Sequence, residues 1–140
     1  MNADGDSRGG AGGRILLIDD DPDMHDAVKM ILEPLGHRVT CCSTGPAGLE
    51  ALRSDPPDLL LLDIMLSSPS EGFYLAAEMK KHPALKDIPI VMISAIGQTM
   101  GTAFAKELGS DYVEADLFLE KPLEAGKLRE AVGRFLRRGA

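Results

Sequence analysis

Carboxylates follow the two most apolar runs of the chain. Four consecutive leucines lead directly to Asp63, and Ile15–Ile18 leads directly to Asp19 and Asp20. At a separation of about 4 Å and an effective dielectric constant of about 20, two carboxylates repel each other by about 4 kcal/mol. A site that gathers these three side chains therefore needs a positive partner. Oxygen ligands of this kind suit Mg²⁺, with Mn²⁺ as an alternative, and leave room for water or a phosphate oxygen.

Two further polar side chains end apolar segments later in the chain. Ser94 follows Ile88–Ile93, and Lys121 follows Leu117–Glu120. The ammonium of Lys121 supplies a positive charge, and a hydroxyl group can donate a hydrogen bond to an oxyanion. Carboxylate, hydroxyl and ammonium groups together predict a site for a divalent cation and a phosphoryl group.

The apolar runs are the predicted strands of a parallel sheet. An apolar run without alternation is typical of a strand that is buried on both faces. Pro56 and Pro57 exclude a helix start before the four leucines. Strands and helices alternate five times, which predicts an α/β fold, a flavodoxin-like (βα)5 sandwich with right-handed crossovers. The expected strands are 14–18, 37–43, 57–62, 88–93 and 117–120, and the expected helices are 22–35, 46–53, 73–81, 98–108 and 124–138.

The predicted order of the strands in the sheet is 2-1-3-4-5. The carboxyl ends of parallel strands meet at one edge of the sheet, and ligands collect where the strand order reverses. This order brings Asp20 and Asp63 together, because the reversal falls between the first and third strands.

The first predicted helix has clear boundary signals. Asp21 is the expected N-cap, and Pro34 is expected to distort the last turn. Leu35 recurs at helical spacing with other apolar residues and is expected to face the core, and Met30 is interpreted as a residue that fills the core. His25 lies on an early turn of this helix, where we expect exposure to solvent rather than metal binding.

Composition limits the classes of protein to be considered. Residues 14–138 are expected to form one domain, and the glycine-rich residues 1–13 a flexible tail. The net charge of −7 argues against direct contact with nucleic acid. No apolar run approaches the ~20 residues that a membrane span needs, so we expect no membrane contact and a cytoplasmic location. The only cysteines, Cys41 and Cys42, are adjacent, which excludes a disulfide framework and a zinc site.

The polar residues at the strand ends resemble the receiver domain of two-component response regulators. The resemblance rests on the acidic pair after the first strand, on Asp63 after the third, on Ser94 and Ala95 after the fourth, and on Lys121 before a proline after the fifth. Each motif alone is a weak signal, whereas four in the right order on the right elements form a strong one. The resemblance covers the whole predicted domain.

The resemblance implies a role for each of these residues. Asp63 would accept a phosphoryl group from the phosphohistidine of a histidine kinase or a phosphotransfer protein, or from a small phosphodonor. The ligands of Mg²⁺ would be Asp20, Asp63 and the backbone carbonyl of Met65, with Asp19 acting through water. The groups that bind the phosphoryl oxygens would be Lys121, the Ser94 hydroxyl and Ala95.

The resemblance also implies a response to phosphorylation. Ser94 would move with its loop toward the phosphoryl group, and the aromatic residue at the position of Phe118 would turn inward. Phe118 is equally well interpreted as an ordinary core residue. Met65 and Ile96 flank the expected phosphoryl position, and neither can form a hydrogen bond to an attacking water. We therefore hypothesise a slowly hydrolysing phosphoaspartate.

The sequence departs from the family pattern in two regions. Ser67 stands where the family usually has a proline, and the loop to Gly72 is one residue longer. The segment between Gly109 and Lys121 is several residues longer than usual. This lengthening alters the face formed by the fourth helix, the fifth strand and the fifth helix, where family members commonly bind partners. The downstream protein partner is therefore unknown from the sequence.

The prediction is a stand-alone phosphoacceptor domain that signals by binding another protein, as a monomer or a weak phosphorylation-dependent dimer. We expect it to be no enzyme beyond its own phosphorylation and dephosphorylation. Two alternatives stay open. One is a pseudo-receiver that acts as a constitutive interaction module. The other is a hydrolase with an aspartyl-phosphate intermediate, which needs a second aspartate two residues after the nucleophile, where this chain has Met65.

Overall fold

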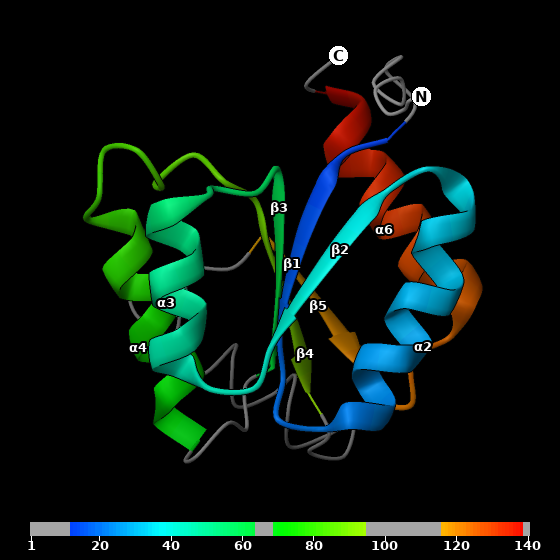
Figure 1. Ribbon diagram of the computed structural model, residues 1–140, viewed down its shortest axis with the longest axis horizontal. Coiled ribbons are helices and arrows are strands. Elements are labelled where there is room, and N and C mark those ends of the chain that lie inside the picture. The colour runs from blue at the N-terminus through cyan, green and yellow to red at the C-terminus, as the bar shows by residue number, and fades with distance from the viewer. Residues whose placement is uncertain (1–11, 64–68, 95–115, 139–140) are drawn as a thin grey trace.

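Five parallel strands form the centre of the computed structural model, which describes residues 12–63, 69–94 and 116–138. The strand order is β2-β1-β3-β4-β5 (Figure 1). This is the predicted flavodoxin-like order, so the expected fold class is confirmed. The strands are β1 (Arg14–Ile18), β2 (Arg38–Cys42), β3 (Leu59–Asp63), β4 (Ile90–Ser94) and β5 (Leu117–Glu120).

Helices cover both faces of the sheet. One face carries α2 (Pro22–Leu32) and α6 (Ala125–Arg138), and the other carries α3 (Gly45–Ser54) and α4 (Pro69–Lys80) (Figure 1). None of these helices combines the length and the apolar character that crossing a bilayer requires, which holds for the described ranges.

Alternate residues of each strand pack against opposite layers of helices. In β3, Leu60 and Leu62 join the core under α3 and α4, while Leu59 and Leu61 join the core under α2 and α6. All four leucines are completely buried. A central strand between two helical layers needs apolar side chains on both faces, which explains why the run shows no alternation.

The turn from β1 into α2 has the predicted capping residues. The side chain of Asp21 accepts a hydrogen bond from the backbone N–H of Asp23 at 3.0 Å. The last turn before Gly36 tightens into a 3-10 helix, η1 (Glu33–Leu35), as expected for a segment that contains a proline. Gly36 has φ of 97°, a conformation that favours glycine, and it ends the helix. These signals fix the path of the chain on either side of α2.

Two expectations about side-chain burial are wrong. Met30 is 73% exposed and Leu35 is 46% exposed. The sheet-facing side of α2 is formed by Met24, Val28 and Leu32, which recur every four residues. Met30 lies two positions beyond Val28 and therefore projects from the opposite side, and Leu35 belongs to η1 rather than to the last turn of α2.

The helix before β4 begins earlier than predicted. It starts at Pro69, whereas the sequence led us to expect a turn as far as Gly72 and a helix from about residue 73. Proline is suited to the first helical turn, where backbone N–H groups have no intrahelical partner, so a turn-like composition there is compatible with a helix. The predicted helix over 98–108 lies outside the described residues, as do residues 1–11 of the expected tail.

Two aspartates fasten the amino ends of neighbouring strands. The backbone N–H of Asp58 donates to the Arg14 carbonyl at 2.7 Å, and the Asp58 carboxylate accepts from the Arg14 N–H at 2.8 Å. Asp116 makes the same pair of bonds with Ile90, at 2.8 and 2.9 Å. We call these pairs the amino-edge brackets. Each bracket provides hydrogen-bond partners for the backbone N–H and C=O of the first residue of a strand, which is Arg14 in β1 and Ile90 in β4.

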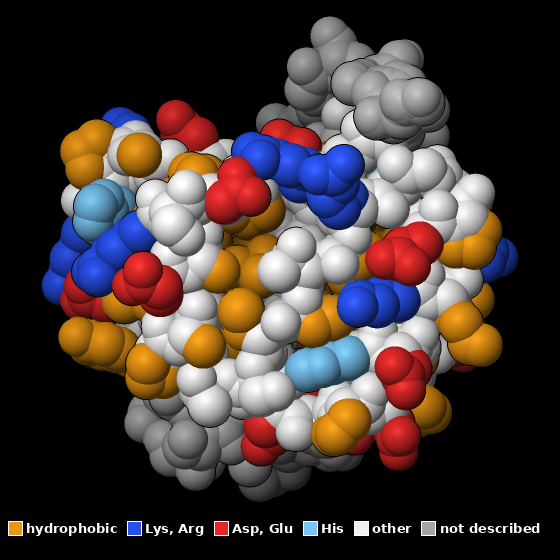
Figure 2. Space-filling model, viewed as in Figure 1, with side chains coloured by type: hydrophobic (Ala, Val, Ile, Leu, Met, Phe, Trp, Pro, Cys, Tyr) orange, Lys and Arg blue, Asp and Glu red, His pale blue; other side chains and the backbone are white. Residues whose placement is uncertain are grey.

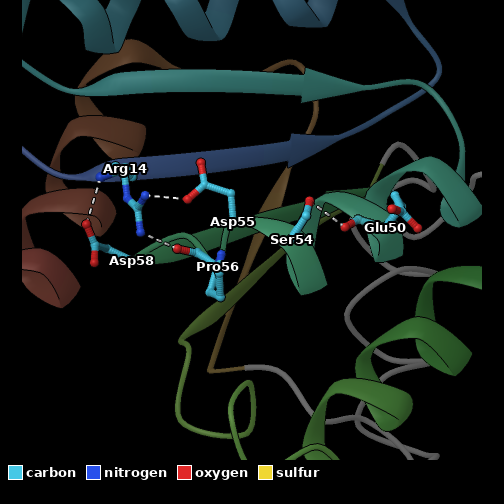
Figure 3. Close-up of polar contacts among 6 residues, drawn as sticks. All are labelled: Arg14, Glu50, Ser54, Asp55, Pro56 and Asp58. Atoms are coloured by element: carbon cyan, nitrogen blue, oxygen red, sulfur yellow. Dashed lines mark hydrogen bonds and ion pairs between the residues drawn. The ribbon is translucent and has the colours of Figure 1, made fainter.

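The Arg14 side chain adds to the first bracket. Its guanidinium donates to the Asp55 carboxylate at 2.5 Å and to the Pro56 carbonyl at 2.6 Å (Figure 3). These bonds connect the first residue of β1 to the segment between α3 and β3. They lie at the end of the sheet opposite to Asp19 and Asp63.

A histidine connects the entry of β1 to the entry of β2. The Gly13 N–H donates to His37 Nδ1 at 3.1 Å, and the Gly13 carbonyl accepts from the Arg38 N–H at 2.9 Å. Partial burial lowers the pKa of His37, because desolvation disfavours the imidazolium. A ring nitrogen that accepts a hydrogen bond must also be unprotonated. The folded protein therefore holds His37 in its neutral form.

The protonation of His37 is predicted to destabilise the fold. The unfolded chain binds this proton more tightly than the native protein, so the free energy of unfolding falls as pH drops from about 6.5 through the lower native pKa. His37→Asn, which keeps an acceptor at the position of Nδ1, should reduce this part of the pH dependence in urea unfolding between about pH 7 and pH 5. His82→Asn is the matched control, because His82 is exposed. Equal slopes for wild type and His37→Asn would contradict the prediction.

The second amino-edge bracket is predicted to stabilise the sheet. Asp116→Ala leaves the N–H of fully buried Ile90 without its acceptor and should lower the free energy of unfolding by about 1 kcal/mol. Asp116→Asn keeps a side-chain oxygen and should lose less. Urea unfolding at neutral pH measures both variants. A loss of the same size in Asp116→Asn would show that charge, rather than the hydrogen bond, is what stabilises this edge.

Candidate functional site

The predicted chemical residues converge at the carboxyl ends of the strands. Asp19 directly follows β1, Asp63 is the last residue of β3, and Lys121 directly follows β5. Strands β1 and β3 are hydrogen-bonded neighbours, with Ile18 opposite Leu62. Two side chains that are 44 positions apart in the sequence thus leave the sheet side by side.

Within the described residues, three carboxylates and one ammonium form the site. Carboxylate oxygens of Asp19, Asp20 and Asp63 lie within 4.8 Å of one another. The Lys121 Nζ lies 3.1 Å from Asp19 Oδ2 and 3.7 Å from Asp63 Oδ2. Asp19 and Asp63 are almost completely buried, whereas Asp20 is exposed. If all four groups are ionised, the cluster carries a charge of −2.

Asp19 is held through its backbone and its side chain. Its N–H donates to the Cys42 carbonyl at 3.0 Å, which continues the pairing of β1 with β2. Its Oδ1 accepts from the Asp21 N–H at 2.9 Å, and its carbonyl lies 2.6 Å from Nε2 of His25. Its buried Oδ2 has the Lys121 charge nearby but no hydrogen-bond partner within the described part of the chain.

This donor set fits a hard divalent cation. All the ligand atoms are carboxylate oxygens, which Mg²⁺ and Mn²⁺ prefer, and the ionised cluster has the opposite charge. Acidic side chains also gather over the beginning of α2 (Figure 2), where Asp20, Asp21 and Asp23 are exposed. A negative surface beside the cluster raises the local concentration of cations.

Several predicted site residues lie outside what the structure describes. Ser94 is placed as the last residue of β4, opposite Glu120 of β5. Its backbone therefore ends at the predicted edge of the sheet, and the role of its hydroxyl stays a prediction. The predicted roles of Met65, Ala95 and Ile96 also stay predictions, because these residues fall within 64–68 and 95–115.

The predicted switch residue Phe118 belongs to β5. It is half-buried, lies opposite Met92 of β4 and packs against the core under α3 and α4. This position is compatible with both earlier interpretations, an ordinary core residue and a residue that moves inward.

The sequence did not predict that His25 contacts the site. The expectation of an exposed side chain is wrong, because the ring is partly buried and its Nε2 lies 2.6 Å from the Asp19 carbonyl. His25 is the fourth residue of α2, and helical side chains point back toward the amino end of their helix. The turn that carries Asp19 lies there. The direction of helical side chains is therefore the signal by which the contact of His25 with Asp19 could have been predicted.

Comparison with known proteins gives the family. The model of the response regulator receiver domain matches residues 15–133. The chain belongs to the response regulator receiver family. Among solved structures, the signal receiver domain of a signal transduction histidine kinase from Syntrophus aciditrophicus has a TM-score of 0.75 and 28% identity, covering 90% of this chain and 91% of that one. The N-terminal domain of a response regulator receiver protein from Methanoculleus marisnigri is 36% identical, with a TM-score of 0.66, covering 87% of this chain and 94% of that one.

Sequence relatives of this receiver domain are longer proteins. The DNA-binding dual master transcriptional regulator RpaA from Synechocystis is 34% identical over 125 residues, which are 89% of this chain and 49% of RpaA. The chain thus spans about half the length of the curated relatives it matches. The expectations of a stand-alone domain and of no contact with nucleic acid stay predictions.

The charge balance of the site predicts opposite effects of two substitutions. Without divalent cations, Asp20→Asn relieves repulsion and should raise the free energy of unfolding by about 1 kcal/mol. Lys121→Met removes the ammonium beside two buried carboxylates and should lower it by about 3 kcal/mol. Urea unfolding in chelator measures both. Adding Mg²⁺ should stabilise wild type and Lys121→Met but hardly Asp20→Asn, because only a protein that binds the cation gains stability from it. Equal stabilisation of all three proteins would contradict a metal site at this cluster.

Proposed function

We propose that this chain accepts a phosphoryl group on Asp63 and signals by binding another protein. The observation that supports this most directly is the position of Asp63. Its buried carboxylate lies 3.7 Å from the Lys121 ammonium and within 4.8 Å of two further carboxylates. An oxygen nucleophile is thus held where positive groups can balance the charge of a phosphoryl group. Membership of the receiver family supports the same role.

The proposed reaction is a displacement at phosphorus. An oxygen of the ionised Asp63 forms a bond to phosphorus while the bond between phosphorus and the imidazole nitrogen of a phosphohistidine breaks. The nitrogen keeps the bonding electron pair. Lys121 holds the carboxylate in place and balances charge on the transferred group, as do the hydroxyl of Ser94 and the backbone at Ala95 in this proposal. Because most of the catalytic requirement is positioning and charge balance, a small site can fulfil it.

The proposed cofactor is Mg²⁺, with Mn²⁺ as a substitute. Asp20, Asp63 and the backbone carbonyl of Met65 are the proposed ligands, and Asp19 acts through water. The buried Oδ2 of Asp19 has no hydrogen-bond partner among the described residues, which supports this assignment, since a hydrated cation would supply one. When bound, the cation neutralises negative charge on the phosphoryl oxygens.

The proposed partners are a histidine kinase or phosphotransfer protein as donor and a further protein as target. Phosphorylation adds charge and acceptor oxygens at the end of β3. Ser94 moves toward them with its loop, and Phe118 packs further inward as that loop leaves its place. The protein acts on no separate substrate in this proposal. Phosphorylation instead changes the surface that the target protein binds.

Phosphorylation of the chain with acetyl phosphate is the decisive experiment. In the presence of Mg²⁺, intact mass should show one added phosphoryl group on wild type and none on Asp63→Asn, and chelator should prevent the addition. Asp58→Asn is the matched control, because it removes an aspartate at the opposite end of β3.

Other outcomes would favour the alternative functions. A folded, Mg²⁺-bound wild type that takes up no phosphoryl group would favour a constitutive interaction module. Turnover of a generic phosphate ester that depends on Asp63 would favour a hydrolase. Equal uptake by wild type and Asp63→Asn would place the acceptor elsewhere.

A further inference from the structure

His25 makes one polar contact that concerns the site. Its Nε2 lies 2.6 Å from the carbonyl oxygen of Asp19. A carbonyl oxygen is only an acceptor, so the ring nitrogen must carry the proton and donate. The neutral Nε2–H tautomer and the imidazolium both provide this donor, and the contact therefore does not depend on a change of protonation.

This hydrogen bond fixes the peptide group that precedes Asp20. The Asp19 carbonyl and the Asp20 N–H belong to one rigid plane, so holding the carbonyl holds the whole peptide. The peptide that follows Asp20 is held as well, because the Asp21 N–H donates to Asp19 Oδ1 at 2.9 Å. Asp20 thus lies between two oriented peptide planes.

The direction of the Asp20 side chain depends on these two planes. Asp20 is exposed, so packing does not hold its carboxylate in place. Its Cα–Cβ bond is instead directed by the backbone on either side, and one of its carboxylate oxygens lies within 4.8 Å of oxygens from both Asp19 and Asp63. A rotation of the preceding peptide would turn that oxygen away from the other two.

We propose that His25 is a positioning residue of the cation site, which acts by holding the Asp19–Asp20 peptide so that the Asp20 carboxylate faces Asp63. The proposal rests on the proposed function, because it concerns the same acidic site. His25 itself is no ligand in this proposal. Its contribution is to reduce the conformational freedom that Asp20 would otherwise lose when a cation binds.

Amide side chains provide a sharp test of the donor. In Gln the amide nitrogen can occupy the position of Nε2, whereas in Asn the amide is one bond shorter and matches Nδ1. His25→Gln should therefore keep the hydrogen bond, and His25→Asn should lose it. His25→Met is similar in size to Gln and suits a helix, but it has no donor. Met30→Gln, at a 73% exposed position of the same helix, is the control for substitution on α2.

The readout is the affinity for Mg²⁺, measured by titration calorimetry on the unphosphorylated chain. His25→Asn and His25→Met should bind Mg²⁺ about tenfold more weakly than wild type, and His25→Gln and Met30→Gln within about twofold of it. Thermal unfolding in chelator shows that each variant is folded at the temperature of the titration.

Two results would overturn the proposal. One is wild-type affinity in a folded His25→Met or His25→Asn. The other is an equal loss in all three His25 variants, which would mean that the donor at Nε2 is not responsible. Acetyl phosphate labelling of the same samples separates the two proposals. A wild type that binds Mg²⁺ but takes up no phosphoryl group would defeat phosphoryl acceptance, while the order of Mg²⁺ affinities would still decide the role of His25.

Discussion

Two buried carboxylates beside the Lys121 ammonium are the constraint on which the rest of the structure depends. Asp19 and Asp63 lose nearly all contact with water, and the Lys121 ammonium lies 3.1 Å from an oxygen of the first and 3.7 Å from an oxygen of the second. Such a cluster is tolerated only because the surrounding fold is stable enough to hold it. The fully apolar strand β3 and its neighbours, packed between two helical layers, supply that stability.

The same arrangement explains why this edge of the sheet suits chemistry. Parallel strands direct the residues that follow them to one edge of the sheet, and the strand order reverses there between β1 and β3, where ligands of such sheets collect. A group that brings positive charge to the cluster relieves repulsion that folding alone cannot remove. The chain belongs to the receiver family, and the proposed phosphoryl transfer relies on positioning and on charge balance more than on covalent chemistry.

The strands and the residues that gather at their carboxyl ends could be predicted from the sequence. Unbroken apolar runs marked the strands. Asp19, Asp63 and Lys121 each stand at the end of such a run and lie together in the structure, because the ends of parallel strands can be recognised from local pattern. The contact of His25 with Asp19 depends on the direction of the His25 side chain after the turn from β1 into α2, and residue spacing does not predict that direction. The exposure of Met30 depends on which side of α2 meets the sheet, and the start of α4 at Pro69 looks the same in sequence as a turn.

The two ends of the sheet differ in how their polar groups are arranged. At the amino end, the brackets of Asp58 with Arg14 and of Asp116 with Ile90 close off backbone groups that a ligand could otherwise use. At the carboxyl end, carboxylate oxygens of Asp19, Asp20 and Asp63 are instead concentrated within 4.8 Å of one another. These hydrogen bonds therefore fix the amino end of the sheet, and the strands keep their pairing there whatever group occupies the carboxyl end. The brackets therefore hold the strand register from the end of the sheet that lies farthest from the acidic cluster.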